Sequence, residues 1–133
     1  MKKNRIFLAA VLLAIGTLAG CGKEKEPVRI ASKPMTEQYI LTEIIGQLSE
    51  NDLDVPVEII KGIGGGTTNI QPALLKGDFD LYPEYTGTAW MTVLKHEKEE
   101  DSDMLYENLQ KDYQDMGLTW SGLYGFQNSY VLA

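Results

Sequence analysis

A ten-residue segment in the middle of the chain, from Leu81 to Trp90, gathers side chains that suit a binding site. Two tyrosines and a tryptophan stand there beside two threonines and a glycine. The negative face of an aromatic ring attracts a cation. The segment begins where an expected short strand at 79–82 ends, and ligands of alternating α/β chains bind where strands end. The pattern indicates a cation site. The alternative is that Tyr82 and Tyr85 are simply half-buried aromatics at a strand end.

The other reactive side chains do not form a catalytic group. The one histidine, His96, lies in the charged stretch 95–101, where a solvated surface role is expected. Ser32 and Ser129 are isolated hydroxyls, so no nucleophile has a base beside it, and no spacing typical of zinc ligands is present. We therefore expect neither an enzyme nor a cofactor or metal site.

A glycine-rich stretch, Gly64 to Thr68, precedes an expected helix. The first N–H groups of a helix attract anions, which makes Thr67 a candidate ligand residue. The stretch lacks the Lys-Ser/Thr ending of a phosphate-binding loop. The alternative is an ordinary tight turn between a strand and a helix.

The N-terminus has the pattern of an export signal. Three basic residues precede the apolar run Ile6 to Ile15, which is too short to span a bilayer. The run leads into Leu-Ala-Gly-Cys, similar to the lipobox of bacterial lipoproteins, and Cys21 is the only cysteine. We expect residues 1–20 to be a signal peptide, Cys21 to carry lipid, and 21–27 to form a polar tether. The alternative is an ordinary signal peptide with a chance cysteine.

The charge balance is acidic. Residues 1–20 contain three of the 12 basic residues and none of the 19 acidic ones, so 9 basic residues remain against 19 acidic. A net charge of −10 repels nucleic acid and mildly favours a cationic ligand.

Hydrophobic periodicity predicts alternating strands and helices, the order typical of a parallel α/β sheet. Strands are expected at 28–31, 55–60 and 79–82, with further extended segments at 118–120 and 126–133. The first helix should begin with Thr36 as its N-cap and bury one apolar face. That face comprises Ile40, Leu41, Ile44, Ile45 and Leu48.

Three later helices are expected. A short one covers 70–75 and stops at Gly77, and another runs from about Thr88 to Leu94. The last shows apolar residues at helical spacing and closes at Gly117. Its apolar residues are Leu105, Leu109, Tyr113 and Met116. Trp90 is expected to pack in the core rather than face a ligand.

Four short segments resemble, in order, landmarks of one family, the substrate-binding lipoproteins of osmoprotectant ABC importers. They are Ile30 to Gln38, Gly65 to Asn69, Asp80 to Thr88 and Tyr124 to Tyr130. The Tyr-Thr-Gly element at 85–87 is the most specific of these matches. The resemblance implies a type II periplasmic-binding-protein-like fold of two α/β lobes that close on ligand. Residues 28–133 would be the first lobe, ending near the crossover to the second.

The resemblance also implies roles for individual residues. Tyr85 and Tyr130 match tyrosines that box a quaternary ammonium group, and Thr88 matches a threonine that binds the ligand carboxylate. Lys33 matches a position that is lysine in some members and glutamine in others, and would pair with that carboxylate. Asn128 stands where some relatives carry an aspartate near the ammonium, which puts direct ion pairing at that position in doubt.

Thr67, Tyr82 and Asn128 are the weaker ligand candidates. The implied function is an extracytoplasmic receptor, held on the membrane by lipid. It would bind glycine betaine, carnitine, choline or proline betaine and deliver it to an ABC permease. One alternative is a receptor for another methylated cation, such as ergothioneine. Another is a surface lipoprotein with no role in transport.

Overall fold

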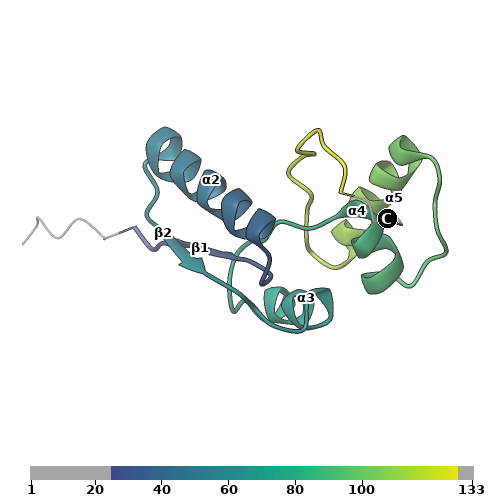
Figure 1. The fold of residues 1–133 in the computed structure, drawn as a ribbon, viewed down its shortest axis with the longest axis horizontal. Coiled ribbons are helices and arrows are strands. Elements are labelled where there is room, and N and C mark those ends of the chain that lie inside the picture. Colours follow the sequence, from purple (N-terminus) through teal and green to yellow (C-terminus); the bar gives the residue numbers. More distant parts are fainter. Residues whose placement is uncertain (1–24, 129–133) are drawn as a thin grey trace, which may run out of the picture.

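The computed structural model describes residues 25–128. The predictions for the signal peptide, Cys21 and Tyr130 lie outside the described residues. Within these residues, two strands and five helical segments follow one another (Figure 1). They are β1 (Val28–Ala31), α2 (Thr36–Leu53), β2 (Val57–Ile60), α3 (Thr67–Lys76), α4 (Thr86–Thr88), the π-helical turn η1 (Ala89–Val93) and α5 (Ser102–Asp115).

Strand β1 is the centre of a small parallel sheet. It pairs with β2 in the register Val28 to Val57, which confirms the predicted parallel order. On its other side, one bridge forms among the described residues, between Ile30 and Leu81. The predicted strand at 79–82 was therefore too long, because the backbone leaves the sheet at the proline that follows Tyr82.

An ion pair fixes this third segment against β1. The guanidinium of Arg29 lies 3.0 Å from Asp80 Oδ1, and the backbone N–H of Arg29 donates to Asp80 Oδ2 at 2.8 Å. These bonds hold the pKa of the Asp80 carboxyl below its ordinary value. The contact brings the chain back to β1 just before the segment rich in aromatic residues begins.

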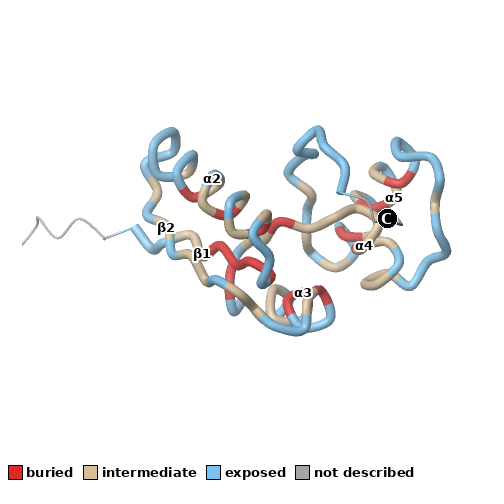
Figure 2. Tube along the Cα trace, viewed as in Figure 1, coloured by how far each residue is buried: buried red, intermediate tan, exposed pale blue. Residues whose placement is uncertain are grey.

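Helices α2 and α3 lie on opposite sides of the strands (Figure 1). On the α3 side, Ala31, Ile70 and Phe79 form a buried cluster. Helix α3 ends as predicted at Gly77, whose φ of 78° is a left-handed conformation that suits glycine. Figure 2 shows this buried region along β1 and the start of α3.

The predicted buried face of α2 was wrong. Ile40, Ile44 and Leu48 are about half exposed, whereas Gln38, Thr42 and Gly46 face the sheet. A Cβ at Gly46 would lie 3.3 Å from Ile59 Cδ1, so the helix backbone packs close to β2. Small and polar side chains permit this approach. Leu41 and Ile45, from the same predicted face, are partly buried, so only the part of that face formed by Ile40, Ile44 and Leu48 lies on the outer side of α2.

The start of α2 also differs from the prediction. The N-cap is Met35, one residue before Thr36, and no side chain caps the helix. In α5, by contrast, Asp101 is an N-cap whose carboxylate accepts from the N–H groups of Asp103 and Met104. Helix α5 buries Leu105, Leu109 and Tyr113, as predicted.

The second cluster lies at the other end of the molecule, where α5 packs on α4 and η1. Trp90 packs against its buried residues, which confirms the predicted core position. The predicted helix at 88–94 starts earlier, at Thr86, and widens into the π-helical turn. Residues 118–128 follow α5 without a regular helix or strand, and the rest of the predicted extended segment at 126–133 lies outside the described residues.

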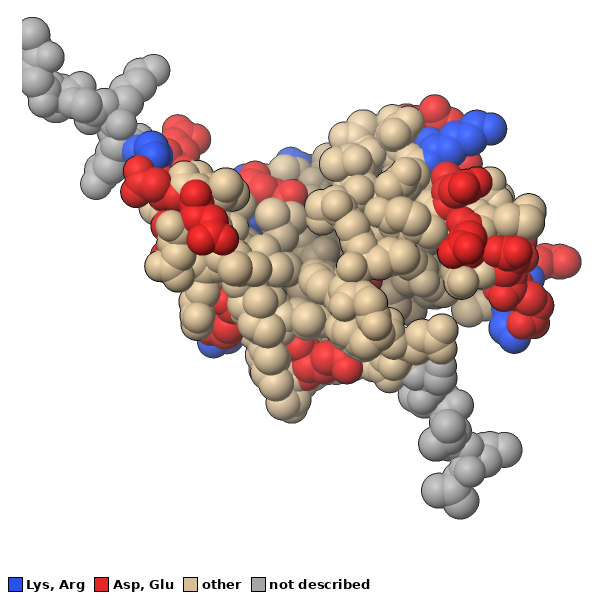
Figure 3. Space-filling view, turned by 90° about the horizontal axis from the view of Figure 1, so that it is seen from above, with Lys and Arg blue, Asp and Glu red and all other residues tan. Residues whose placement is uncertain are grey.

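Charge is unevenly spread over the surface. Acidic side chains gather at the end of the molecule that carries the segment 97–103 and α5 (Figure 3). His96 lies beside this region, with Nε2 3.0 Å from Asp112, and its side chain is exposed as predicted. Within residues 25–128, no helix has both the length and the apolar character needed to cross a bilayer.

Candidate functional site

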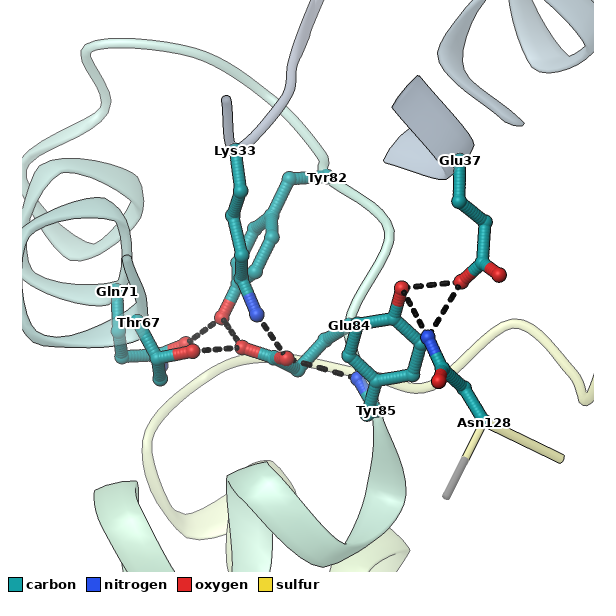
Figure 4. Close-up of polar contacts among 8 residues, drawn as sticks. All are labelled: Lys33, Glu37, Thr67, Gln71, Tyr82, Glu84, Tyr85 and Asn128. Atoms are coloured by element: carbon teal, nitrogen blue, oxygen red, sulfur yellow. Dashed lines mark hydrogen bonds and ion pairs between the residues drawn. The ribbon is translucent and has the colours of Figure 1, made fainter. Parts of the chain in front are cut away.

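A buried carboxylate, Glu84, organises the segment that the sequence singles out (Figure 4). Lys33 forms an ion pair with Glu84 Oε1, and the N–H of Tyr85 donates to the same oxygen at 2.7 Å. Thr67 and Tyr82 donate to Oε2 at 2.7 and 3.0 Å. Four donors from three separate stretches of chain thus converge on one side chain.

The pairing of Lys33 with Glu84 is almost fully enclosed, because both side chains are 5% exposed. Lys33 is the second residue after β1, and Glu84 is the third residue after Leu81, which bridges to Ile30 of β1. The parallel pairing of these two stretches brings Lys33 and Glu84 together. A charge at such depth requires a partner. Glu84 neutralises Lys33, whose ammonium has three donors and keeps the others for further acceptors.

The ammonium of Lys33 also lies over two aromatic rings. Its Nζ is 5.8 Å from the ring centre of Tyr82 and 5.3 Å from that of Tyr85. Both distances suit an attraction between a cation and an aromatic face. The two rings are therefore arranged to face positive charge.

Tyr82 belongs partly to the core. Its ring packs edge-on against Phe79 at 6.2 Å between ring centres. Its hydroxyl oxygen lies 2.7 Å from Gln71 Oε1 and 3.0 Å from Glu84 Oε2, and its one proton is shared between these two acceptors. Burial, reinforced by the negative charge of Glu84, raises the pKa of the Tyr82 phenol. The hydroxyl therefore remains a neutral donor.

Tyr85 lies at the edge of this network and points its hydroxyl toward Glu37, in the first turn of α2 (Figure 4). The amide of Asn128 donates to Glu37 Oε1 at 3.1 Å and to the Tyr85 oxygen at 3.4 Å. Burial and the hydrogen bond to Glu37 raise the pKa of Tyr85, so this phenol is neutral too. Three residues distant in sequence meet at one point.

The glycine-rich stretch forms a tight turn stabilised by its own residues. Thr68 Oγ1 donates to the carbonyl of Gly65 at 2.7 Å, and Asn69 Nδ2 donates to that of Gly64 at 2.9 Å. Gly65 has a φ of 82°, and a Cβ there would lie 2.1 Å from Asn69 Nδ2. These bonds support the alternative of an ordinary turn. Thr67 contributes its hydroxyl to Glu84.

The structure thus brings together five of the predicted ligand residues. Lys33, Thr67, Tyr82, Tyr85 and Asn128 lie around Glu84 and Glu37. Thr88 lies three residues after Tyr85 at the end of α4, and within residues 25–128 its side chain makes no hydrogen bond. The ligand roles of all these residues, and of Tyr130, stay predictions.

Sequence reasoning missed Glu84, Glu37 and Gln71 as members of the network. A signal for Glu84 was present, because it is the one acidic residue between Leu81 and Trp90 and has hydroxyl donors on both sides. Glu37 was interpreted only as a favourable charge at a helix start. The sequence also did not indicate that the Gln38 side chain is buried. Its amide has no hydrogen-bond partner among the described residues.

The chain is similar to known transport proteins over most of its length. Residues 26–133 match the family OpuAC, described as the substrate-binding domain of the ABC-type glycine betaine transport system. The ergothioneine transport permease/ergothioneine binding protein EgtU of Helicobacter pylori is 50% identical over 111 residues, covering 83% of this chain and 20% of the relative. The carnitine transport binding protein OpuCC of Listeria monocytogenes is 33% identical over 141 residues, covering 98% and 46%.

Two solved structures have a similar fold. Apo YehZ from Escherichia coli aligns with a TM-score of 0.60 and 31% identity, over 68% of this chain and 32% of that one. The structure titled glycine betaine/carnitine/choline ABC transporter aligns with a TM-score of 0.61 at 23% identity, over 68% of this chain and 34% of that one, and bears on the fold alone. The predicted α/β lobe of the periplasmic-binding-protein type is confirmed.

The chain spans between 20% and 46% of the length of these curated relatives. The family match nevertheless covers nearly all of the described residues, and the site residues found in the structure lie inside it. The chain therefore belongs to the family of substrate-binding domains of ABC-type glycine betaine transport systems.

Proposed function

We propose that this chain forms the first lobe of an extracytoplasmic receptor that binds a quaternary-ammonium osmolyte and delivers it to an ABC permease. Glycine betaine, carnitine, choline and proline betaine are the candidate ligands. The observation that carries the proposal is the position of the Tyr85 ring, which lies 5.3 Å from the Lys33 ammonium and donates its hydroxyl to Glu37. The receptor performs no chemistry on its ligand.

The physical basis is the chemistry of a methylated ammonium. Such a group has no N–H to donate, so hydrogen-bond acceptors do not distinguish it from water, whereas ring faces attract it. Each ring contributes about 0.5 to 2 kcal/mol, depending on how far the cation is desolvated. A micromolar ligand needs about 8 kcal/mol in total, so several rings must act together. Tyr85, and Tyr130 outside the described residues, are the proposed members from this lobe.

Lys33 and Thr88 are the proposed partners of a ligand carboxylate. The Lys33 ammonium keeps donors beyond the one that faces Glu84, and Thr88 is at the end of the short helix that follows Tyr85. Because Glu84 cancels the charge of Lys33, this lysine binds a carboxylate without strongly repelling the cation of the same zwitterion.

We also propose that residues 1–20 direct export and that Cys21 carries the lipid that holds the mature protein at the outer face of the cell membrane. The acidic composition and the polar stretch 21–27 support a solvated lobe joined to the anchor by a polar tether. Mass spectrometry of the mature protein would show the diacylglyceryl group on its N-terminal cysteine.

A second candidate ligand is ergothioneine, favoured by the 50% identity to a relative named for ergothioneine transport and binding. Ergothioneine is itself a trimethylated zwitterion, so the same ring faces and the same lysine would hold its two charged ends. The two candidates differ in the imidazole-thione ring, which a pocket for a small osmolyte need not accommodate.

A calorimetric panel tests the proposal and ranks its two candidates. The native gene product is titrated with glycine betaine, carnitine, choline, proline betaine and ergothioneine. We expect micromolar or tighter binding of at least one trimethylated zwitterion, and no binding of the unmethylated control, glycine. If one of the osmolytes binds most tightly, the panel supports an osmolyte receptor. If ergothioneine binds most tightly, it supports an ergothioneine receptor. A folded protein that binds none of the five compounds would contradict the proposal.

A further inference from the structure

We propose that Glu37 supplies the negative charge of the ligand site, in place of the carboxylate that Asn128 lacks. This inference rests on the proposed function and adds a specificity-determining residue to it. In this account Glu37 attracts the methylated cation through its field and orients the ring that contacts it.

The first support is the placement of the Glu37 carboxylate. Its Oε1 accepts from the hydroxyl of Tyr85 and, at 3.1 Å, from the amide of Asn128. The carboxylate of Glu37 is thus within hydrogen-bond distance of the side chain at position 128. Asn128 carries no charge, but Glu37, 91 positions earlier in the sequence, places a carboxylate beside it.

The second support is the charge balance around the ring of Tyr85. Lys33 is neutralised by Glu84, so that buried pair contributes little net field. Among the salt bridges of residues 25–128, none includes Glu37, whose bonds come from the neutral donors Tyr85 and Asn128. Glu37 is thus an acidic side chain at the edge of the ring that none of these salt bridges neutralises.

The third support is the range of the interaction. A cation on the face of a tyrosine lies within about 6 Å of the ring centre. The carboxylate is bonded to the hydroxyl of that ring, so the cation and Glu37 are separated by less than about one Debye length, roughly 8 Å at physiological salt. A phenol that donates to a carboxylate is also polarised, which makes its ring more negative.

A position in the first turn of α2 favours an acidic residue for another reason, the positive end of the helix dipole. The dipole explains a stabilising charge but not the direction in which the side chain points. Glu37 extends toward Tyr85 and Asn128, at the edge of the proposed ligand site (Figure 4).

The test compares Glu37→Gln with Glu50→Gln in the native gene product, by calorimetric titration with choline. Both substitutions remove one negative charge from α2, and Glu50 is exposed about 20 Å away along the helix. We expect choline affinity to fall at least tenfold in Glu37→Gln and less than twofold in Glu50→Gln. Adding Asn128→Asp to Glu37→Gln returns a charge to the site and should restore most of the affinity.

The loss of affinity in Glu37→Gln should also shrink as salt is added, because an electrostatic contribution is screened and a packing contribution is not. Equal affinities in Glu37→Gln and the native protein, or a loss that Asn128→Asp does not restore, would overturn the role of Glu37 while leaving the proposed function intact. Absence of binding by the native protein to any quaternary-ammonium compound would overturn both.

Discussion

Replacing Glu84 by leucine is expected to lower the free energy of unfolding by about 3 to 5 kcal/mol. Leucine has a similar volume, so the main consequence is a Lys33 ammonium that is 5% exposed and has lost its carboxylate. The hydroxyls of Thr67 and Tyr82 lose an acceptor at the same time. Urea unfolding followed by tryptophan fluorescence measures the change.

The control also replaces Lys33, whose buried ammonium would otherwise have no carboxylate partner. Adding Lys33→Met to Glu84→Leu replaces the ion pair by two apolar side chains, and most of the lost stability should return. Glu107→Leu, on an exposed position of α5, should change stability by less than about 0.5 kcal/mol. If Glu84→Leu were as mild as Glu107→Leu, the fold would not depend on the carboxylate that neutralises Lys33.

The second large effect is expected for Tyr85→Ala, which should weaken quaternary-ammonium binding at least tenfold, or about 1.4 kcal/mol. The loss of one ring face accounts for this magnitude. Tyr85→Phe keeps the ring but removes the hydroxyl that binds Glu37, so its loss should be smaller. Isothermal titration calorimetry of the native protein and the two variants gives the three affinities.

A matched control is Tyr106→Ala, which removes a partly exposed tyrosine from α5 outside the network. Its affinity should equal that of the native protein. An unchanged affinity in Tyr85→Ala, with the fold intact by circular dichroism, would refute the assignment of this ring to the cation.

Local patterns predicted the order of elements well. Strand β1, helices α3 and α5 and the end of α3 at Gly77 follow from short-range periodicity and turn chemistry. The parallel pairing of β1 with β2 follows from the helix that connects them, because such a crossover returns the chain in the same direction. These features depend on residues near one another in sequence.

The face of α2 was not predictable in this way. Apolar periodicity identifies a face but not which side meets the sheet, and the small residue Gly46 determined that choice by allowing close approach to Ile59. The length of the third strand depends on a tertiary contact in addition to the proline after Tyr82, because the Asp80 side chain takes the backbone N–H of Arg29. Periodicity carries no information about either contact.

The candidate site was predictable only in part. The aromatic segment and the family landmarks identified Lys33, Tyr85 and Asn128, which the structure gathers in one region. The roles of Glu84 and Glu37 depend on pairs separated by 51 and 48 positions, which no single-sequence pattern records. Polar contacts between residues so far apart in sequence become visible only in the three-dimensional structure.

The central claim is that aromatic faces recognise a methylated ammonium by its positive charge and not by its size and shape. Titration of the native protein with choline and with its neutral carbon isostere, 3,3-dimethylbutan-1-ol, tests this directly, because the two have nearly the same size and apolar surface. We expect choline to bind at least tenfold more tightly. Equal affinities for the two compounds would contradict the claim.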